Sequence, residues 1–304
     1  MEKKPRLLHH SLSSGSLAPA FGAKGAALDA APGAAPVRRP APIATILART
    51  ADPAGALARL NRLGAARDVE ALWALLAETL GLFGFDCVSY GLTRMNGRGS
   101  LGDPRDLLFL TNASPERLAR GYTSEFLMRT PMFRWVRNNV GACSWRWAEE
   151  EYAAGRLLPD EIAAMQHSRS LGILAGYSIS FAAPQSRTRG AIALTGRPGL
   201  TQDDVEVIWT RRSTEITALC TTAHLRLCQL PLQGARRPLS PRQREALEWV
   251  AEGKTTQDIA MIMGISAAMV EKHLRLARQV LDVETTAHAV AKAAQLNQIF
   301  NRPD

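Results

Sequence analysis

Charged side chains recur at helical spacing near the C-terminal end of the chain. The outer face of the segment 267–281 consists of Ala267, Glu271, Lys272, Arg275 and Arg278. The inner face is apolar, with Val270, Leu274, Ala277 and Leu281. Arg and Lys side chains can bond a guanine edge or a phosphate, and a Glu carboxylate can accept from cytosine N4. The outer face therefore has the chemistry to contact DNA, although ordinary solvated helices carry such charge mixtures too.

The segments around 267–281 favour the DNA-binding interpretation. Ser240 and Pro241 are typical of a helix start, and Gly253 is typical of a helix end. A short second helix then begins at Thr255 or Thr256, and a tight turn at residues 264–266 leads into the third helix. The sequence thus predicts four helices in 238–304, and it predicts DNA contacts from Lys254, Thr255, Ser266, Ala267, Glu271, Lys272, Arg275 and Arg278.

The segment PRQREALEWVAEGKTTQDIAMIMGISAAMVEKHL resembles the C-terminal helix-turn-helix domain of LuxR-family bacterial transcription regulators. Leu247 and Gly253 match positions characteristic of that family, whereas Gln243 replaces a Glu. The family usually has a Thr at 269 and a basic residue near 280 and 286, where this chain has other residues: Met269, Val280 and Thr286. These departures affect the expected affinity and target sequence more than the fold.

The resemblance implies a transcription regulator that binds double-stranded DNA as a dimer. Two recognition helices about one helical turn apart would then meet an inverted repeat, and RNA polymerase is an implied partner. The alternative is a protein-binding partner that forms a heterodimer with a related regulator and modulates it. The basic residues Lys254, Lys272, Arg275 and Arg278 favour the first interpretation, and the losses at Gln243, Val280 and Thr286 favour the second less strongly.

Residues 55–230 alternate between helical and strand patterns. Apolar residues in GALARLNRLG and VEALWALLAETLGLFG follow helical steps, as do those in PERLARGYTSEFLMRT and PDEIAAMQHSRSLG. Strand patterns occur in FDCVSYGLTRM, DLLFLTN, GYSISFAAP and GAIALTG. We therefore predict an α+β protein, with an N-terminal α/β/α sandwich around an antiparallel sheet and a C-terminal four-helix helix-turn-helix domain.

The same region resembles, more weakly, the autoinducer-binding domain of quorum-sensing LuxR regulators. The resemblance lies in GFDCVSYGL, RTPMFRWV, CSWRWAEE and SLGILAGYSISF. It implies a pocket for an acyl-homoserine lactone between the sheet and one helical layer, with a Trp, two Tyr and an Asp holding the lactone end. The implied ligand-binding or wall residues are Tyr90, Tyr122, Phe126, Thr130, Trp145 and Trp147, which could equally be plain core residues.

Most of the polar anchors that the resemblance calls for are absent. Thr130 stands at the Asp position, and the Trp position falls on Arg117 or Leu118. One Tyr position falls on Ala113 and the other on Gly121, unless a shift of one residue brings Tyr122 into place. A standard acyl-homoserine lactone is therefore not the favoured ligand. Another small molecule and the absence of any diffusible ligand stay open.

Residues 201–230 are predicted to form one long helix that begins at Thr201. An apolar stripe runs along it through Val205, Ile208, Trp209, Ile216, Leu219, Ala223 and Leu227. The stripe could pack on its own domain or form a dimer seam, and the sequence favours neither. The Pro and Gly content of 231–237 is typical of a linker.

The composition limits the remaining function classes. Residues 1–54 are rich in Ala, Pro, Gly and Ser, which predicts a disordered tail. Much of the net charge of +9 lies there, whereas 238–304 is close to neutral. No apolar run is long enough for a membrane span or a secretion signal, so we expect a cytoplasmic protein.

Enzymatic and metal chemistry find little support in the sequence. The four cysteines are scattered without CxxC spacing, which argues against a metal site. Gly97, Gly99 and Gly102 satisfy GxGxxG, but a strand rather than a helix is expected to follow, so we interpret them as a hairpin loop. We expect no enzyme, no catalytic residues and no cofactor.

Overall fold

The structure is a computed structural model that describes residues 43–93, 107–182, 188–230 and 238–300. The sequence-based interpretations of residues 1–42, of the glycine loop at 97–102 and of the linker 231–237 lie outside these ranges. The helices in the described ranges include none that is both long and apolar enough to cross a membrane.

Three helices precede the sheet: α1 (Ile43–Arg49), α2 (Pro53–Ala65) and α3 (Val69–Leu82). Asp52 and Asp68 cap α2 and α3, because their carboxylates accept from backbone N–H groups of the first turn. The prediction of a disordered tail through residue 54 is wrong for residues 43–54. The Ile46 side chain of α1 is buried in the domain core, and this contact orders a segment whose composition alone indicated disorder.

Five strands form one antiparallel sheet in the order β2-β1-β5-β4-β3. Their bounds are β1 (Phe85–Thr93), β2 (Leu108–Thr111), β3 (Gly141–Ser144), β4 (Gly176–Ser180) and β5 (Arg189–Gly196). Strand β3 was not predicted from the sequence, because its four residues are too few to show an alternating pattern. It adds an edge beside β4, opposite the edge formed by β2.

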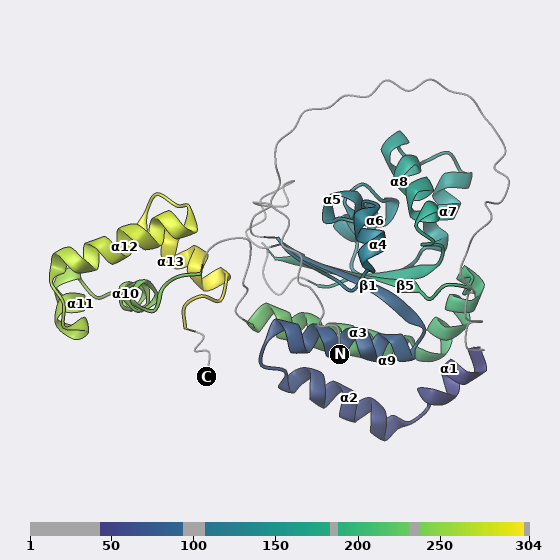
Figure 1. Cartoon of the computed structure of the whole chain (residues 1–304), viewed down its shortest axis with the longest axis horizontal. Coiled ribbons are helices and arrows are strands. Elements are labelled where there is room, and N and C mark those ends of the chain that lie inside the picture. Colours follow the sequence, from purple (N-terminus) through teal and green to yellow (C-terminus); the bar gives the residue numbers. More distant parts are fainter. Residues whose placement is uncertain (1–42, 94–106, 183–187, 231–237, 301–304) are drawn as a thin grey trace.

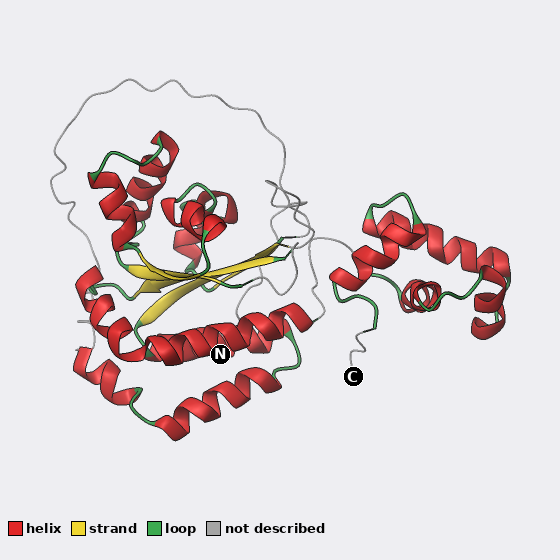
Figure 2. Cartoon of the chain, turned by 180° about the vertical axis from the view of Figure 1, so that it is seen from behind, coloured by secondary structure: helices red, strands yellow, loops and turns green. Residues whose placement is uncertain are grey.

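Helices cover both faces of the sheet (Figures 1 and 2). One face carries α3 and the long α9 (Gln202–Gln229), with α2 beyond them. The other face carries five shorter helices, namely α4 (Pro115–Ala119), α5 (Ser124–Leu127), α6 (Pro131–Asn138), α7 (Arg146–Ala153) and α8 (Pro159–Ser170). The predicted α/β/α sandwich is thereby confirmed.

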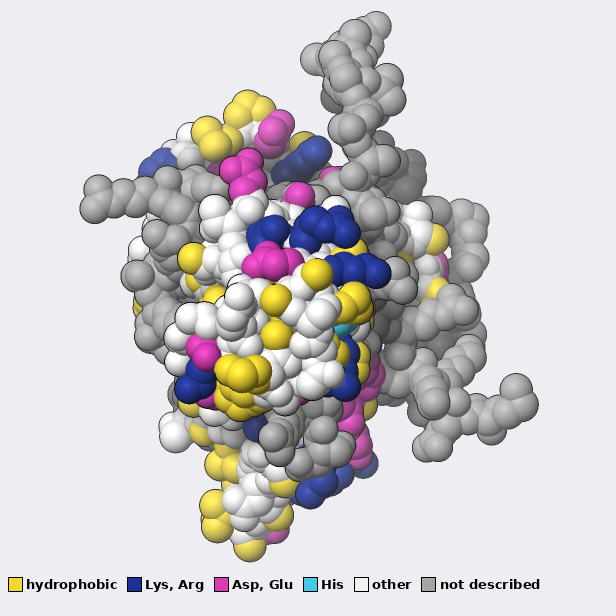
Figure 3. All heavy atoms as spheres, turned by 90° about the vertical axis from the view of Figure 1, so that its left-hand side faces the viewer, with side chains coloured by type: hydrophobic (Ala, Val, Ile, Leu, Met, Phe, Trp, Pro, Cys, Tyr) yellow, Lys and Arg dark blue, Asp and Glu magenta, His cyan; other side chains and the backbone are white. Residues whose placement is uncertain are grey.

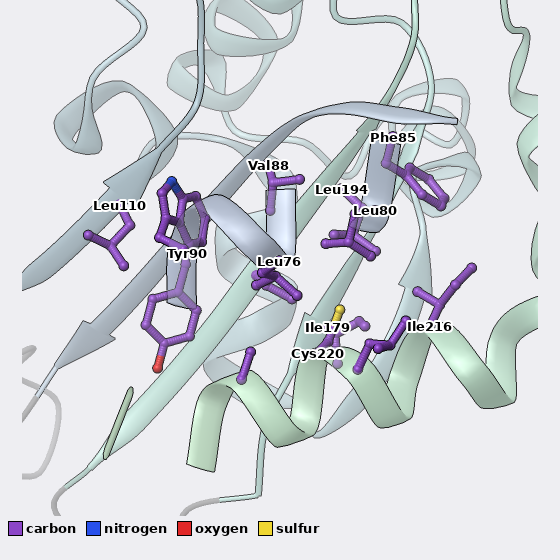
Figure 4. Close-up of a cluster of buried hydrophobic side chains, with 14 of the residues drawn as sticks. Leu76, Leu80, Phe85, Val88, Tyr90, Leu110, Ile179, Leu194, Ile216 and Cys220 are labelled. Atoms are coloured by element: carbon purple, nitrogen blue, oxygen red, sulfur yellow. The ribbon is translucent and has the colours of Figure 1, made fainter. Parts of the chain in front are cut away.

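The main core lies between the sheet and the layer of α3 and α9. Figure 4 shows side chains from both layers meeting there, among them Leu76, Val88, Leu194 and Ile216. The apolar stripe of α9 is buried in this core, since Val205, Ile208, Ile216, Leu219, Ala223 and Leu227 are at most 1% exposed. These six side chains therefore pack on their own domain and are not available as a dimer seam, and Trp209, the remaining residue of the predicted stripe, is partly buried against the same core.

Residues 238–300 form a separate helical unit with its own core. Its helices are α10 (Pro241–Ala251), α11 (Thr256–Met263), α12 (Ala267–Leu281) and α13 (Thr286–Gln295). Ser240, Thr255 and Ser266 accept first-turn N–H groups and so fix the starts of α10, α11 and α12. Gly264 adopts φ +64° at the turn between α11 and α12, a conformation that glycine tolerates best.

Candidate nucleic-acid interface and ligand cavity

The two faces of α12 differ sharply in burial. Val270, Leu274, Ala277 and Leu281 are at most 4% exposed and form the centre of the small helical core. Glu271, Lys272 and Arg275 are exposed on the opposite face. The helical unit thus holds α12 rigidly by its apolar side and presents the predicted polar face to solvent, as groove insertion requires.

The side chains on that face are not equally free. The Glu271 carboxylate accepts from Thr256 Oγ1 at 2.9 Å, and Arg278 Nη1 donates to Thr286 Oγ1 at 2.8 Å. Within the described ranges, Lys272 and Arg275 have no hydrogen-bond or ion-pair partner of this kind. Lys272 and Arg275 are therefore the two outer-face cations whose full donor capacity is open to a phosphate or a base edge.

The predicted contacts at the helix starts have capping roles as well. Thr255 Oγ1 donates to Asp258 Oδ2 at 2.6 Å and accepts from the Asp258 N–H, while Lys254 beside it is exposed. Hydrogen bonds from Thr255 and the charge of Lys254 hold the pKa of the Asp258 carboxyl below its usual range. Figure 3 looks onto this end of the molecule and shows Lys and Arg side chains gathered beside acidic ones.

The departures from the LuxR pattern have local structural consequences. Gln243 keeps the capping function of a Glu, because its Oε1 accepts from the Ser240 N–H at 2.9 Å. Thr286 accepts from Arg278, and Val280 packs against the small helical core. Met269 is 40% exposed at the start of α12, where it adds an apolar side chain next to the polar face.

Two adjoining cavities lie between the sheet and the five-helix layer. The larger holds about 250 Å³ and the smaller about 100 Å³. Both are lined by Leu127, Thr130, Met132, Ser178 and Ala193, so they meet along α5, α6 and the central strands. Most side chains of the larger cavity are apolar, as expected for a site that encloses a hydrophobic ligand.

Four of the predicted ligand residues line the smaller cavity: Tyr122, Phe126, Thr130 and Trp145. The Phe126 ring packs against Tyr122 at 5.9 Å and against His167 at 5.0 Å between centroids. Trp145 donates through Nε1 to Ser178 Oγ at 3.0 Å. Because Ser178 accepts this bond, its own hydroxyl proton is available to an acceptor inside either cavity.

Tyr122 ends a chain of buried hydroxyl groups. Its hydroxyl lies 2.9 Å from Ser89 Oγ, which lies 2.9 Å from Thr111 Oγ1, and Thr111 donates to the Val88 carbonyl at 3.2 Å. The proton order that satisfies all three bonds runs from Tyr122 to Ser89 to Thr111. Burial raises the pKa of the Tyr122 hydroxyl well above its ordinary value, so it stays protonated. Its oxygen keeps a lone pair that can accept from a ligand.

The Thr130 hydroxyl already forms hydrogen bonds with the neighbouring backbone. Its Oγ1 donates to the Leu127 carbonyl at 2.7 Å and accepts from the Phe133 N–H at 3.3 Å, which caps α6. A carboxylate at this position could accept a ligand N–H as a charge-assisted bond. The neutral and already bonded Thr130 offers a much weaker acceptor.

The structure places two of the predicted wall residues differently from the other four. Tyr90 borders the larger cavity, but its hydroxyl bonds His224 Nδ1 at 2.8 Å and its ring belongs to the core on the α9 side of the sheet. Trp147 lines neither cavity, and its ring lies 5.2 Å from the Arg134 guanidinium instead. The alternation of side chains along a strand explains why the Tyr90 ring lies on the α9 side, since its neighbours Ser89 and Gly91 face the cavity.

The remaining positions at which the family resemblance places lactone-anchoring Trp and Tyr residues also lie outside the two cavities. Arg117 donates through Nε to the Leu171 carbonyl at 3.2 Å, and Ala113 is buried beside Cys87. Neither these residues nor Leu118 and Gly121 belong to the lining of either cavity. Sequence reasoning missed Ser178, although the alternation in GYSISF places it on the face opposite Tyr177 and Ile179.

Comparison with known proteins matches two successive regions of the chain. Residues 68–227 match the family described as "Autoinducer binding domain", and residues 237–293 match "Bacterial regulatory proteins, luxR family". The chain belongs to the luxR family. Its order of an autoinducer-binding domain and a helix-turn-helix domain is that of the quorum-sensing transcription regulators in this family.

Similar luxR-family proteins include the quorum sensing-dependent transcriptional regulator RpaR of Rhodopseudomonas palustris, 29% identical over 50% of this chain and 60% of RpaR. The activator CarR of Pectobacterium carotovorum is 40% identical over 21% of this chain and 26% of CarR. The chain thus spans less than two thirds of these two relatives. AnoR of Acinetobacter nosocomialis is 24% identical over 76% of this chain and 92% of AnoR. All three are transcription regulators by name.

Among solved structures, Escherichia coli SdiA is similar with a TM-score of 0.48 and 18% identity, covering 82% of this chain and 99% of SdiA. Within the described ranges, no three His, Cys, Asp or Glu side chains gather as a metal site would require.

Proposed function

We propose that this luxR-family protein is a dimeric regulator of transcription that reads an inverted repeat in double-stranded DNA with α12. The observation that carries this proposal is that Lys272 and Arg275 are exposed on the outer face of a helix whose inner face is buried, and that neither has a partner among the described residues. Such a helix can enter the major groove, with Arg275 at a guanine edge and Lys272 at a guanine or phosphate.

The remaining predicted contacts support α12 in this role. Lys254, Thr255 and Ser266 stand at helix starts, where backbone N–H groups and cations meet phosphates. Ala267, Glu271 and Arg278 complete the face. We further propose that the protein acts in the cytoplasm, as a homodimer, with RNA polymerase as a partner. Heterodimer formation with a related regulator is the alternative.

We also propose that the cavity binds a small molecule other than a standard acyl-homoserine lactone. Thr130 offers no free charge-assisted acceptor for a lactone amide, a bond worth about 1.5–3 kcal/mol. Ser178 and Tyr122, which line the smaller cavity together with Thr130, offer only neutral hydroxyl groups to a ligand. Tyr122, Phe126, Thr130 and Trp145 are the proposed contacts from the smaller cavity, and Tyr90 borders the larger one.

The DNA proposal is tested by selection from a pool of random duplexes with full-length protein and no added lactone, at several salt concentrations. We expect enrichment of a palindromic site. Arg275→Ala should weaken binding to that site by roughly 5- to 150-fold, the loss typical of a bidentate arginine. The matched control is Arg62→Ala, which removes an exposed arginine on α2.

The opposite result would be folded protein that binds all duplexes equally, weakly and in a salt-sensitive way. Arg275→Ala would then have no more effect than Arg62→Ala. That outcome would overturn DNA recognition by α12 in the absence of added ligand, and it would favour an obligatory ligand or the heterodimer alternative.

A further inference from the structure

The larger cavity is apolar over most of its lining but carries two arginines. Arg137 in the last turn of α6 and Arg189 at the start of β5 both line it. Arg137 is exposed and Arg189 is half-buried, so they mark the part of the cavity that reaches solvent. Among the lining residues that the structure describes, Glu125 on α5 is the single carboxylate, against the two arginines.

Neither arginine is neutralised by the described part of the protein. Arg189 Nη1 donates to the Val136 carbonyl at 3.2 Å, and the Arg137 guanidinium lies 6.0 Å from the centroid of the Phe133 ring. Within the described ranges, neither guanidinium has a carboxylate partner. Their neighbour Arg134 differs, since it pairs with Glu161 Oε1 at 2.8 Å and with Glu151.

A hydrogen bond places the Arg189 guanidinium beside the backbone of the α6 turn that carries Arg137. Arg189 bonds the carbonyl of Val136, which directly precedes Arg137, and Val136 itself is buried. A bond to a carbonyl orients a guanidinium without cancelling its charge, and the other N–H groups of Arg189 stay free to donate. The oriented Arg189 guanidinium, together with the Arg137 guanidinium in the same cavity lining, supplies the N–H donors and the positive charge that a carboxylate requires.

We propose that the cavity takes a carboxylate-ended amphiphile, such as a medium-chain fatty acid or an aryl carboxylate. Its apolar body packs against Phe109, Leu127, Met132, Phe133 and Ile192, and its carboxylate bonds Arg137 and Arg189. This inference rests on the proposed function, since it names the ligand class of the cavity proposed there. It makes recognition depend on the anionic end of the ligand rather than on a lactone head.

The test uses full-length protein and three probes with matched chains: decanoate, methyl decanoate and decan-1-ol. Binding is measured by calorimetry at neutral pH, and the thermal midpoint is followed in parallel. We expect decanoate to bind at least roughly tenfold more tightly than the two neutral probes, and this margin to shrink as salt rises. Bound decanoate should also raise the midpoint.

Arg137→Gln removes one cation and is the safer variant for folding, because the Arg137 side chain makes no hydrogen bond within the described ranges. We expect it to weaken decanoate binding roughly tenfold or more while methyl decanoate is unaffected. Arg137→Gln combined with Arg189→Gln should abolish the preference. The matched control is Arg129→Gln, which removes an exposed arginine that lines neither cavity.

Equal affinity for decanoate and its methyl ester, or equal losses in Arg137→Gln and Arg129→Gln, would overturn the proposal. The DNA selection on the same preparations separates this failure from that of the proposed function. Site-specific DNA binding without any decanoate preference refutes only the carboxylate ligand. A decanoate preference without DNA recognition refutes only the regulator.

Discussion

At the scale of single residues, buried hydroxyl groups define the polar part of the smaller cavity. Tyr122 is 1% exposed, and its hydroxyl bonds Ser89 on the sheet face that carries the five shorter helices. A buried hydroxyl without a partner is costly, so this bond fixes where the Tyr122 ring stands. Phe126 packs on that ring, and the position of the cavity wall therefore depends on one hydrogen bond.

We predict that Tyr122→Phe lowers the free energy of unfolding by about 1 kcal/mol, because Ser89 loses its donor while the ring volume is kept. Urea unfolding measures the change. Tyr152→Phe is the control, since Tyr152 is 46% exposed on α7. Equal midpoints for the two variants would show that the hydroxyl chain adds no stability.

A second residue-scale prediction concerns pH. Burial raises the pKa of the Glu206 carboxyl, but bonds from Ser144, Tyr177 and Gln202 and the charge of Arg146 outweigh it, so the pKa lies below the usual 4.5. A depressed pKa contributes stability that is present above 4.5 and is lost as pH falls through the folded-state pKa. The stability difference between the wild type and Glu206→Gln should therefore be largest at neutral pH.

This difference is measured by urea unfolding of both proteins in a series of buffers from neutral to acidic. It should shrink steadily below pH 4.5, where protonation removes the charge that the network stabilises. A stability difference that is constant with pH would mean that the hydrogen bonds to Glu206 stabilise the fold equally whether or not its carboxyl is charged.

At the scale of elements, periodicity predicted the long segments well. Helices α3, α9 and α12 and strands β1 and β5 fall where apolar residues follow a clear period. The segment 115–130, expected to be one helix, is instead split into α4 and α5, with Gly121 at φ +92° between them. Helical spacing could not detect this break, because residues on both sides of Gly121 pack into the same layer.

The cavity was only partly predictable for a similar reason. Tyr122, Phe126, Thr130 and Trp145 were found through the family resemblance, which supplies their position along the chain. Tyr90 and Trp147 could not be placed from the resemblance alone, because the face of a strand or helix that meets the cavity depends on tertiary packing. Arg137 and Arg189 lie 52 residues apart, and only the fold brings both to one cavity.

We predict opposite effects for two glycine substitutions. A Cβ on Gly176 in β4 would lie 2.3 Å from the Leu194 carbonyl oxygen and 2.9 Å from the Trp145 ring, so Gly176→Ala should destabilise by about 1–3 kcal/mol. A Cβ on Gly81 in α3 meets nothing within 4 Å, so Gly81→Ala should stabilise by about 0.5–1 kcal/mol.

Thermal or urea unfolding measures both variants, and tryptophan fluorescence, to which Trp145 contributes, reports whether the cavity wall moves in Gly176→Ala. A Gly176→Ala protein as stable as the wild type would mean that β4 and β5 can separate to admit a methyl group.

At the scale of the whole molecule, the DNA-binding unit touches the end of the sensor helix. Asn297 Nδ2 donates to the Cys228 carbonyl at 2.6 Å and to the Leu230 carbonyl at 2.9 Å. These carbonyls lie at the end of α9, where the last carbonyl groups of a helix have no N–H partner within the helix itself. A side chain from one unit thus caps a helix of the other. Whatever displaces the end of α9 must also break or carry this contact.

We predict that Asn297→Gly loosens the two units without unfolding either. Glycine keeps the positive φ of 55° at this position and removes both donated bonds. Small-angle scattering should show a larger radius of gyration for the variant. Asn297→Asp keeps the side-chain shape but cannot donate these hydrogen bonds, so it should show the same increase in the radius of gyration. Unchanged scattering from both variants would contradict a role for this contact.

The burial of the α9 stripe also affects how readily the subunits of a dimer would dissociate. Because each copy already covers its own apolar stripe, two copies can separate without exposing a hydrophobic core to water. Val207 and Leu225 are the large apolar side chains that α9 still exposes, at 42% and 48%. A dimer of this chain built on them would exchange subunits readily, so its abundance would follow the amount of protein in the cell.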